Sequence, residues 1–306
     1  MEVAQVHAFL AIHRHKSFTS AAAELHLSQP AISRRLALLE VQLGASLLDR
    51  LPTGVVLTDA GRAVLPYAEA MVAANLDAVT AVAEVVGGRK GTVTLAIVGT
   101  LASTQLRDTL RGFRDARPEV DVKLHTARSV VVSDLVRRGE AMLGLRYEPD
   151  PSLDSKILYD EPLVPICAAD HPLARRRRIT ASTLAGERWL TFPPSENVHE
   201  PYDNALSEQL TPRGLARAET MFIDSLTAQK RLVEAGYGLA FVPATSIEEE
   251  LRSGTLQVLN LARPGPAIPV ALIRRPGAAE TAAVRALADA LHQQADSRPS
   301  DRHRNR

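Results

Sequence analysis

The chain has 306 residues, of which 45% are hydrophobic and 23% are charged, and its formal net charge is +1. This length is enough for roughly two domains with cores of their own, and the composition excludes a chain that is disordered throughout. The longest apolar stretches, such as Thr92 to Val98, are far shorter than the roughly 20 residues of a membrane-spanning helix, and the first residues lack the pattern of an export signal. We therefore expect a cytoplasmic protein with no membrane association.

The cysteine content and the charge distribution narrow the chemistry further. The single cysteine, Cys167, excludes an internal disulfide and a zinc site built from cysteines, and its apolar neighbours favour a buried core thiol. We expect no metal and no cofactor. The first 90 residues contain as many Lys and Arg as Asp and Glu, so a DNA-binding function there has to rest on how the basic residues are arranged.

Three short helices are expected at the start of the chain. Apolar residues from Val3 to Ile12 recur at helical spacing. A second helix begins near Thr19, which is placed to cap it, and a third begins after Ser28, with Pro30 in its first turn where no N–H is needed. The short connection between the second and third helices predicts a helix-turn-helix.

The third helix has an apolar face and a polar face. The residues expected to face the core are Ile32, Leu36, Leu39 and Leu43, and those expected to project elsewhere are Gln29, Ser33, Arg34 and Arg35. A Gln side chain bonds adenine, Arg bonds guanine with two hydrogen bonds, and Ser or backbone N–H groups hold phosphate. This pattern suits a helix N-terminus in the major groove of DNA. The alternative is an ordinary three-helix unit with a solvated polar face.

A hairpin and a long helix follow. Leu47 to Arg50 and Val55 to Leu57 are predicted strands joined around Pro52-Thr53-Gly54, which gives a wing. Thr58 to Gly61 offers a cap for the long helix, whose apolar stripe consists of Val64, Ala68, Met71, Leu76, Val79, Val82 and Val86. A stripe of this length predicts pairing with the same helix of a second copy, in a homodimer or homotetramer.

These segments resemble the LysR-type transcriptional regulator family, through Ser17 to Ala22, Leu27 to Ser33, Leu39-Glu40, Leu43-Gly44, Leu47, Arg50 and Leu57 to Gly61. The resemblance implies a winged helix-turn-helix over 1–58 and a linker helix over 59–90. The expected contacts to double-stranded promoter DNA are Thr19, Ser28, Gln29, Pro30, Ala31, Ser33, Arg34, Arg35, Arg50, Thr53 and Thr58. The chain departs from the family in its wing turn, Leu51 to Val55, which lacks the usual basic residue.

After a glycine-rich hinge at 87–91, predicted strands alternate with predicted helices, which indicates a parallel sheet covered by helices. The strands are expected at 92–98, 120–126, 141–145, 163–168 and 189–191, and the helices at 103–116, 130–138, 200–210, 224–235 and 278–294. Two α/β lobes account for this pattern.

The same half resembles the family's effector domain at Leu135 to Gly139, Asp170 to Leu173 and Val233 to Pro243. That domain is similar to periplasmic solute-binding proteins. The resemblance implies an effector domain over 91–295, in which 91–161 and 266–294 form lobe I and 162–265 form lobe II. The tail, 296–306, has no apolar residues that could pack in a core and is expected to be disordered.

Ligand contacts are expected where strands end, because open α/β sheets bind ligands at the carboxyl edge. The candidates are Thr100, Ala102, Ser103, Arg146, Phe192, Ser195 and Thr227, among which Arg146 stands out as a cation. An anion would suit these positions. Capping or loop roles are the alternative for each of them. Ala141 to Gly144 stands where the family usually has Leu-Asp-Leu-Ala, so pocket details do not transfer.

The sequence thus predicts a DNA-binding transcriptional regulator whose activity changes when a small-molecule effector binds in the cleft, with RNA polymerase as a further candidate partner. An enzyme built on the α/β half is one alternative, but the chain has no Gly-x-Ser-x-Gly elbow, no His-Glu-x-x-His and no phosphate-binding loop. We therefore expect no enzyme activity. A free-standing solute-binding protein is the other alternative, and it would need an export signal and no helix-turn-helix. The effector, the promoters, and activation as against repression stay open.

Overall fold

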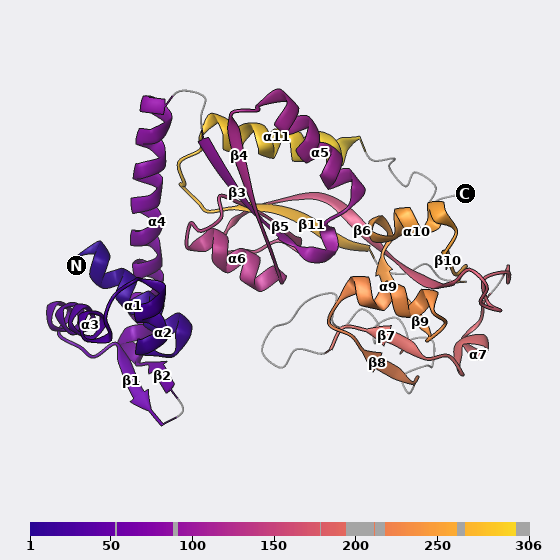
Figure 1. The fold of residues 1–306 in the computed structure, drawn as a ribbon, viewed down its shortest axis with the longest axis horizontal. Coiled ribbons are helices and arrows are strands. Elements are labelled where there is room, and N and C mark those ends of the chain that lie inside the picture. Colours follow the sequence, from indigo (N-terminus) through magenta and orange to yellow (C-terminus); the bar gives the residue numbers. More distant parts are fainter. Residues whose placement is uncertain are drawn as a thin grey trace. The chain divides into compact units, whose positions relative to one another are not determined.

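The computed structural model describes residues 1–52, 54–87, 91–177, 179–193, 211, 218–261 and 267–297 (Figure 1). The chain divides into two compact units. Unit 1 contains Met1–Gly88 with two short segments, Arg137–Glu140 and Gly277–Thr281, and unit 2 contains Arg89–Val136, Ala141–Pro276 and Ala282–Arg306. No helix in the described ranges is long and apolar enough to cross a membrane.

The N-terminal unit is a helix-turn-helix followed by a two-stranded wing and a long helix, as predicted. Its elements are α1 (Val3–His15), α2 (Phe18–Glu24), α3 (Gln29–Leu43), β1 (Leu48–Leu51), β2 (Gly54–Leu57) and α4 (Asp59–Gly87). The strands β1 and β2 pair antiparallel, with Leu48 opposite Leu57. The core between the three short helices contains Phe9, Ile12, Ile32, Leu36 and Leu39, each at most 5% exposed.

Two local expectations in this unit are corrected. The cap of α2 is Ser17, whose hydroxyl accepts a hydrogen bond from Ser20 N at 3.3 Å, and not Thr19. The helix begins at Phe18, which is buried in the core, so Thr19 already lies inside its first turn. Leu43 is 40% exposed because it is the last residue of α3. By contrast, Ser28 caps α3 as predicted, accepting from Ala31 N at 3.4 Å.

The helix α4 begins at the predicted cap and buries only part of its apolar stripe. Thr58 Oγ1 accepts a hydrogen bond from Gly61 N at 2.9 Å, which satisfies one of the N–H groups that a helix start leaves free. Ala68 is 1% exposed, whereas the residues of the stripe nearer the end of the helix are exposed by 40 to 63%, namely Leu76, Val79 and Val82. The side chain of Val86 lies outside the described part of the chain.

The C-terminal unit is built on one sheet with the strand order β4-β3-β5-β11-β6-β9-β7-β8, and β10 also pairs with β6. Its strands are β3 (Gly91–Val98), β4 (Val120–Ala127), β5 (Leu143–Tyr147), β6 (Asp154–Ala168), β7 (Trp189–Thr191), β8 (Thr220–Phe222), β9 (Leu239–Pro243), β10 (Leu256–Val258) and β11 (Ala267–Arg274). Its helices are η1 (Gly99–Leu101), α5 (Thr104–Ala116), α6 (Ser129–Arg137), α7 (Ala181–Leu184), α9 (Leu226–Glu234), η3 (Ala244–Ile247), α10 (Glu248–Ser253) and α11 (Ala282–Asp296). The helix expected at 200–210 falls outside the described residues.

The sheet is mixed, which corrects the prediction of a parallel sheet. The strand β3 pairs parallel with β4 and β5, but β11 pairs antiparallel with both β5 and β6. The strand β6 is also far longer than the predicted 163–168. Its first half, up to Glu161, is largely exposed or half-buried and lacks the continuous apolar run that marks a buried strand.

The strand β6 joins the two lobes of the C-terminal unit. Its residues 154–162 pair with β11, and residues 163–166 pair with β9. Lobe I therefore contains β3, β4, β5, β11 and the first half of β6, with α5, α6 and α11, and lobe II contains the second half of β6 with β7, β8, β9 and β10. Because one strand runs through both, the last residues of strands in each lobe come to one region.

A substitution at Gly61 tests how closely the first turn of α4 packs against the segment that leads into the wing. A Cβ added at Gly61 would lie 2.0 Å from the backbone oxygen of Leu47, so the first turn of α4 would have to move away from β1. We expect Gly61→Ala to lower the free energy of unfolding of this unit by at least about 3 kcal/mol, the upper range for overpacked sites. Denaturant unfolding followed by circular dichroism measures this. Ala63→Ser, on an exposed position two residues on, is the matched control, and equal stability of the two variants would contradict the packing described here.

Candidate DNA interface and ligand cavity

The start of α3 presents polar side chains to solvent. Gln29 and Arg34 are exposed and Ser33 is half-buried, because the opposite side of the helix carries the buried Ile32 and Leu36. Of the other predicted contacts on this helix, Pro30 is exposed, and Ala31 and Arg35 are half-buried. Amide, hydroxyl and guanidinium groups together at a helix N-terminus supply donors and acceptors for base edges and for phosphate.

The predicted DNA contacts outside α3 have different surroundings. The guanidinium of the exposed Arg50 lies 4.0 Å from the ring centre of Phe18, a cation–π contact that ties the wing strand β1 to α2. Thr58 donates its hydroxyl hydrogen to Ser46 O at 2.7 Å and accepts from Gly61 N at 2.9 Å, so its hydroxyl caps α4. Thr19 is exposed on α2, and Thr53 lies outside the described residues.

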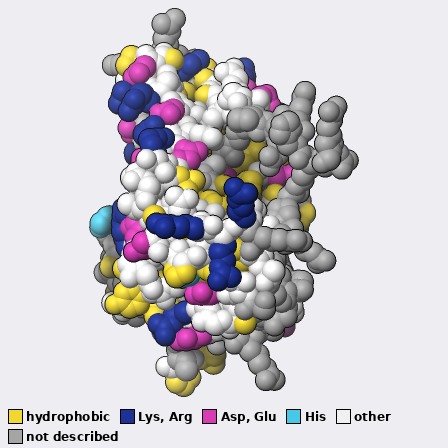
Figure 2. All heavy atoms as spheres, turned by 90° about the vertical axis from the view of Figure 1, so that its right-hand side faces the viewer, with side chains coloured by type: hydrophobic (Ala, Val, Ile, Leu, Met, Phe, Trp, Pro, Cys, Tyr) yellow, Lys and Arg dark blue, Asp and Glu magenta, His cyan; other side chains and the backbone are white. Residues whose placement is uncertain are grey.

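Side chains of both charge signs are present on the face that Figure 2 shows. Where Figure 2 shows described residues, Lys and Arg side chains lie among Asp and Glu side chains, and several basic side chains gather near the middle of this face.

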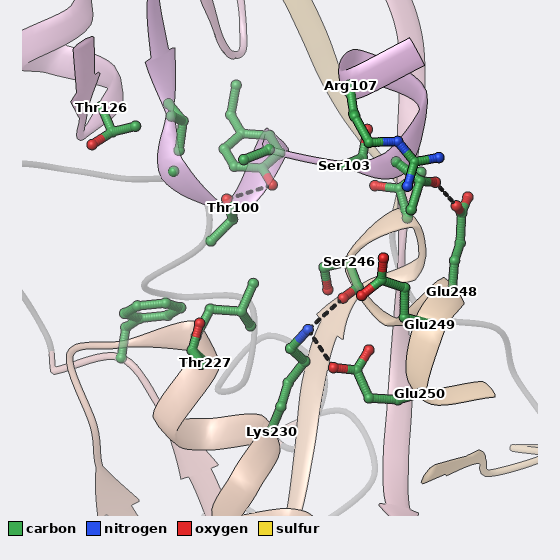
Figure 3. A pocket seen from close by; sticks show the side chains of 18 of the residues that line it. Thr100, Ser103, Arg107, Thr126, Thr227, Lys230, Ser246, Glu248, Glu249 and Glu250 are labelled. Carbon is green, nitrogen blue, oxygen red and sulfur yellow. Dashed lines mark hydrogen bonds and ion pairs between the residues drawn. The ribbon is translucent and has the colours of Figure 1, made fainter. Parts of the chain in front are cut away.

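A cavity of about 670 Å³ lies in the C-terminal unit, between the ends of strands from both lobes (Figure 3). It brings together five of the residues predicted to contact a ligand: Thr100, Ala102, Ser103, Phe192 and Thr227. The first three follow β3, Phe192 follows β7, and Thr227 is in the first turn of α9. Thr100 and Tyr147 hold each other through their hydroxyl oxygens, which are 2.8 Å apart.

Arg146 does not line this cavity, which corrects its place among the candidates. Its side chain is buried, and the guanidinium donates to Ser133 Oγ, to Asp150 Oδ2 at 3.3 Å and to Tyr147 O at 2.9 Å. A buried cation needs such partners, and here they fasten α6 to the turn after β5. Ser195, the remaining candidate, lies outside the described residues.

Several charged lining residues were missed by the strand-end argument. Arg107 lies one helical turn after Ser103, and Lys230 lies three residues after Thr227, so helical spacing would have found both. Glu248, Glu249 and Glu250 follow η3, which in turn follows β9. The rule applied to the other strand ends would have pointed to this segment if the intervening short helix had been recognised.

These charged side chains form a network. The ammonium of Lys230 lies 2.7 Å from Glu250 Oε1 and 2.8 Å from Ser246 O. Thr104 donates its hydroxyl hydrogen to Glu248, which links the first turn of α5 in lobe I to α10 in lobe II (Figure 3). The hydrogen bond to Asp108, with the nearby charges of Glu249 and Glu248, raises the pKa of Arg107, so its guanidinium stays charged.

Two family profiles match the sequence. Residues 3–62 match "Bacterial regulatory helix-turn-helix protein, lysR family", and residues 87–296 match "LysR substrate binding domain". The chain belongs to the LysR family. It is a transcriptional regulator with an N-terminal DNA-binding domain and a C-terminal effector-binding domain.

Relatives of this LysR-family regulator cover most of its length. It is 31% identical over 259 residues to the RuBisCO operon transcriptional regulator of Allochromatium vinosum, covering 84% of both chains. It is also 31% identical over 295 residues to a probable hydrogen peroxide-inducible genes activator of Streptomyces viridosporus, covering 95% of this chain and 93% of the other.

Solved structures share the fold. A full-length OxyR variant from Pseudomonas aeruginosa aligns with a TM-score of 0.69 at 20% identity, covering 95% of this chain and 94% of the other. Full-length CbnR in complex with its target DNA aligns with a TM-score of 0.62 at 21% identity, covering 96% and 100%. Both alignments extend over nearly the whole of each chain, so the fold is shared along its length.

The only cysteine of the chain has the properties of a core residue. Cys167 lies in β6 and is 0% exposed. Burial, with the nearby carboxylates of Glu187 and Asp170, raises the pKa of its thiol to about 11. Since the thiolate is the reactive form, Cys167 is a poor target for peroxide or alkylating agents at neutral pH.

We expect iodoacetamide at pH 8 to leave Cys167 unmodified in the folded regulator and to label it fully in guanidinium, as measured by intact-protein mass. The raised pKa also has a consequence for stability. Between pH 9 and 11 the unfolded thiol loses its proton and the folded thiol keeps it, so stability falls by up to about 2–3 kcal/mol as pH rises. This loss is expected to be smaller in Cys167→Ala, measured side by side. Rapid labelling of the folded protein would contradict the buried thiol.

Proposed function

We propose that this regulator acts in the cytoplasm as a homodimer or a pair of dimers on an interrupted inverted repeat. The N-terminus of α3 from each copy enters the major groove, and a small molecule in the cavity changes the geometry between copies. The organisation is a DNA-binding domain at 1–58, a linker helix at 59–90 and an effector domain at 91–295. The observation that carries this proposal is the polar start of α3, where Gln29 and Arg34 are exposed and Ser33 is half-buried, opposite a buried apolar face.

Base reading is assigned to α3 because the wing turn offers no basic side chain to DNA. The wing turn has no basic side chain among its described residues, Leu51, Pro52, Gly54 and Val55. The guanidinium of Arg50, on the strand before this turn, already stacks on the ring of Phe18. Few phosphate contacts give a shallow dependence of affinity on salt. Discrimination between sequences then depends on Gln29 and Arg34, whose side chains suit adenine and guanine.

Dimerisation is assigned to the second half of α4. Leu76, Val79 and Val82 are exposed by 40 to 63% in the single chain, and burying apolar surface contributes about 25 cal/mol per Å². A second copy of α4 would cover them, and the pair of α3 helices in the resulting dimer would match the symmetry of an inverted repeat.

The effector is assigned to the cavity because its volume is that of small-molecule sites, roughly 300–1,000 Å³. Its walls come from both lobes, so a bound molecule contacts both and biases their arrangement. The described lining residues include no histidine or cysteine, so they hold no hydroxyl–histidine or cysteine–histidine pair of the kind that activates a nucleophile. That the chain has no enzyme activity is part of this proposal.

Alanine variants of α3 test the DNA-reading role. We expect Gln29→Ala and Arg34→Ala each to cost about 1–3 kcal/mol on the regulator's own upstream DNA and to relax discrimination at one base position. Gel shifts across a salt series, with operators mutated one base pair at a time, measure both effects. Gln42→Ala, exposed near the other end of the same helix, is the control and should bind as the unmodified protein does. If the Gln29 and Arg34 variants match Gln42→Ala, a different surface reads the DNA.

A further inference from the structure

One wall of the ligand cavity carries a buried carboxylate oxygen without a hydrogen-bond donor. Glu250 is 6% exposed, and its Oε1 is held by Lys230. Its Oε2 is fully buried and has no hydrogen-bond partner among the described atoms. A buried acceptor on a charged group that lacks a donor costs free energy, so this oxygen is a place where a donor from a ligand would be stabilised.

A second acceptor of the same kind lies close by in the chain. Thr245 also lines the cavity, and its hydroxyl oxygen is buried without a partner in the described structure. The backbone N of Thr245 donates to Oε1 of the fully buried Glu161 at 3.0 Å, which fixes this segment in place. The wall therefore presents two oxygens, from Glu250 and Thr245, on a backbone that is held from behind.

The charge of the described cavity lining favours a cation over an anion. The described lining contains four acidic residues (Asp224, Glu248, Glu249 and Glu250) and three basic residues (Arg107, Arg128 and Lys230), a difference of one negative charge. Lys230 forms an ion pair with Glu250. Arg107 forms an ion pair with Asp108, a carboxylate that is not among the lining residues.

Glu249 adds a carboxylate that is accessible from the cavity. Its side chain is exposed, and it forms no ion pair within 4.0 Å with any residue in the described ranges. In Figure 3 its carboxylate lies on the same wall as those of Glu248 and Glu250, facing the space between Lys230 and Arg107. A ligand nitrogen near Glu250 Oε2 would thus meet a second negative charge.

We propose that the effector of this regulator carries a protonated nitrogen, an ammonium or guanidinium group, which donates to Glu250 Oε2 and Thr245 Oγ1 and is balanced by Glu249. The inference rests on the proposed function, since it names the chemistry of the molecule that the cavity senses. It also changes the earlier expectation of an anion: an acidic group on the ligand would belong at the hydroxyl-rich lobe I side, by Thr100 and Ser103, and the lobe II side takes the cation.

The test is a binding screen on the full-length regulator. One arm contains compounds with a charged nitrogen: the standard L-amino acids, putrescine, spermidine and agmatine. The other arm contains acids without nitrogen: succinate, glutarate, citrate and benzoate. Thermal shift at millimolar concentration finds binders, and calorimetry measures their Kd. We expect binders in the first arm only.

Two variants connect binding to the wall. Glu250→Gln removes the charge but keeps the shape, and we expect it to weaken the nitrogen-bearing binders by at least about tenfold, as for loss of a hydrogen bond to a charged group. Glu249 is exposed, so we expect Glu249→Gln to leave folding intact and to weaken binding of the nitrogen-bearing compounds several-fold. Glu119→Gln, an exposed carboxylate outside the cavity lining, is the control and should bind normally.

Three results would overturn the inference: binding by the acids alone, no binding in the first arm, or binding that neither cavity variant weakens. Each preparation is also tested for retardation of the upstream DNA. If the protein binds its upstream DNA at discrete sites but gives any of these three results, the proposed regulator function stands and only the cation site is refuted. Failure to bind DNA specifically would instead refute the proposed function itself.

Discussion

The arrangement of the C-terminal unit depends on the continuous backbone pairing of β6. This strand bonds to β11 with residues 154–162 and to β9 from Leu163 onward, so the two lobes are parts of a single sheet. Glu161, fully buried at the change of partner, accepts a hydrogen bond from Thr245 N just after β9. The residues that end β3, β7 and β9 consequently face one cavity, and a molecule bound there touches both lobes.

A second constraint sets which side of α3 faces outward from the core of the N-terminal unit. Burial of Ile32, Leu36 and Leu39 against α1 and α2 leaves one possible outward side for α3, and that side carries Gln29 and Arg34. The caps at Ser17, Ser28 and Thr58 set where α2, α3 and α4 begin. Thr58 and Arg50 also make contacts inside this unit, with Ser46 O and with the ring of Phe18.

Much of this architecture could be predicted from periodicity and capping. The bounds of α3 and α5 follow from apolar spacing and from serine caps, and β7 matches the predicted Trp189 to Thr191. The antiparallel β11 and the first half of β6 could not be predicted, because their pairing joins residues more than 100 positions apart and half of β6 has no apolar run. Arg146 was misplaced for a related reason. The end of a strand predicts where Arg146 lies in the sheet but not which side chains surround it. Its buried partners, Ser133 and Asp150, come from other parts of the chain.

Nuclease footprinting of the full-length regulator on its own upstream DNA, with excess nonspecific competitor, tests the central claim most directly. A dimer that places two α3 helices in successive major grooves predicts two protected half-sites, with centres separated by about 10 base pairs or a multiple of that spacing. Protection should survive the competitor and should change when a cavity ligand is added. Weak protection that is equal across all sequences and is removed by the competitor would contradict the account, because α3 would then not read bases.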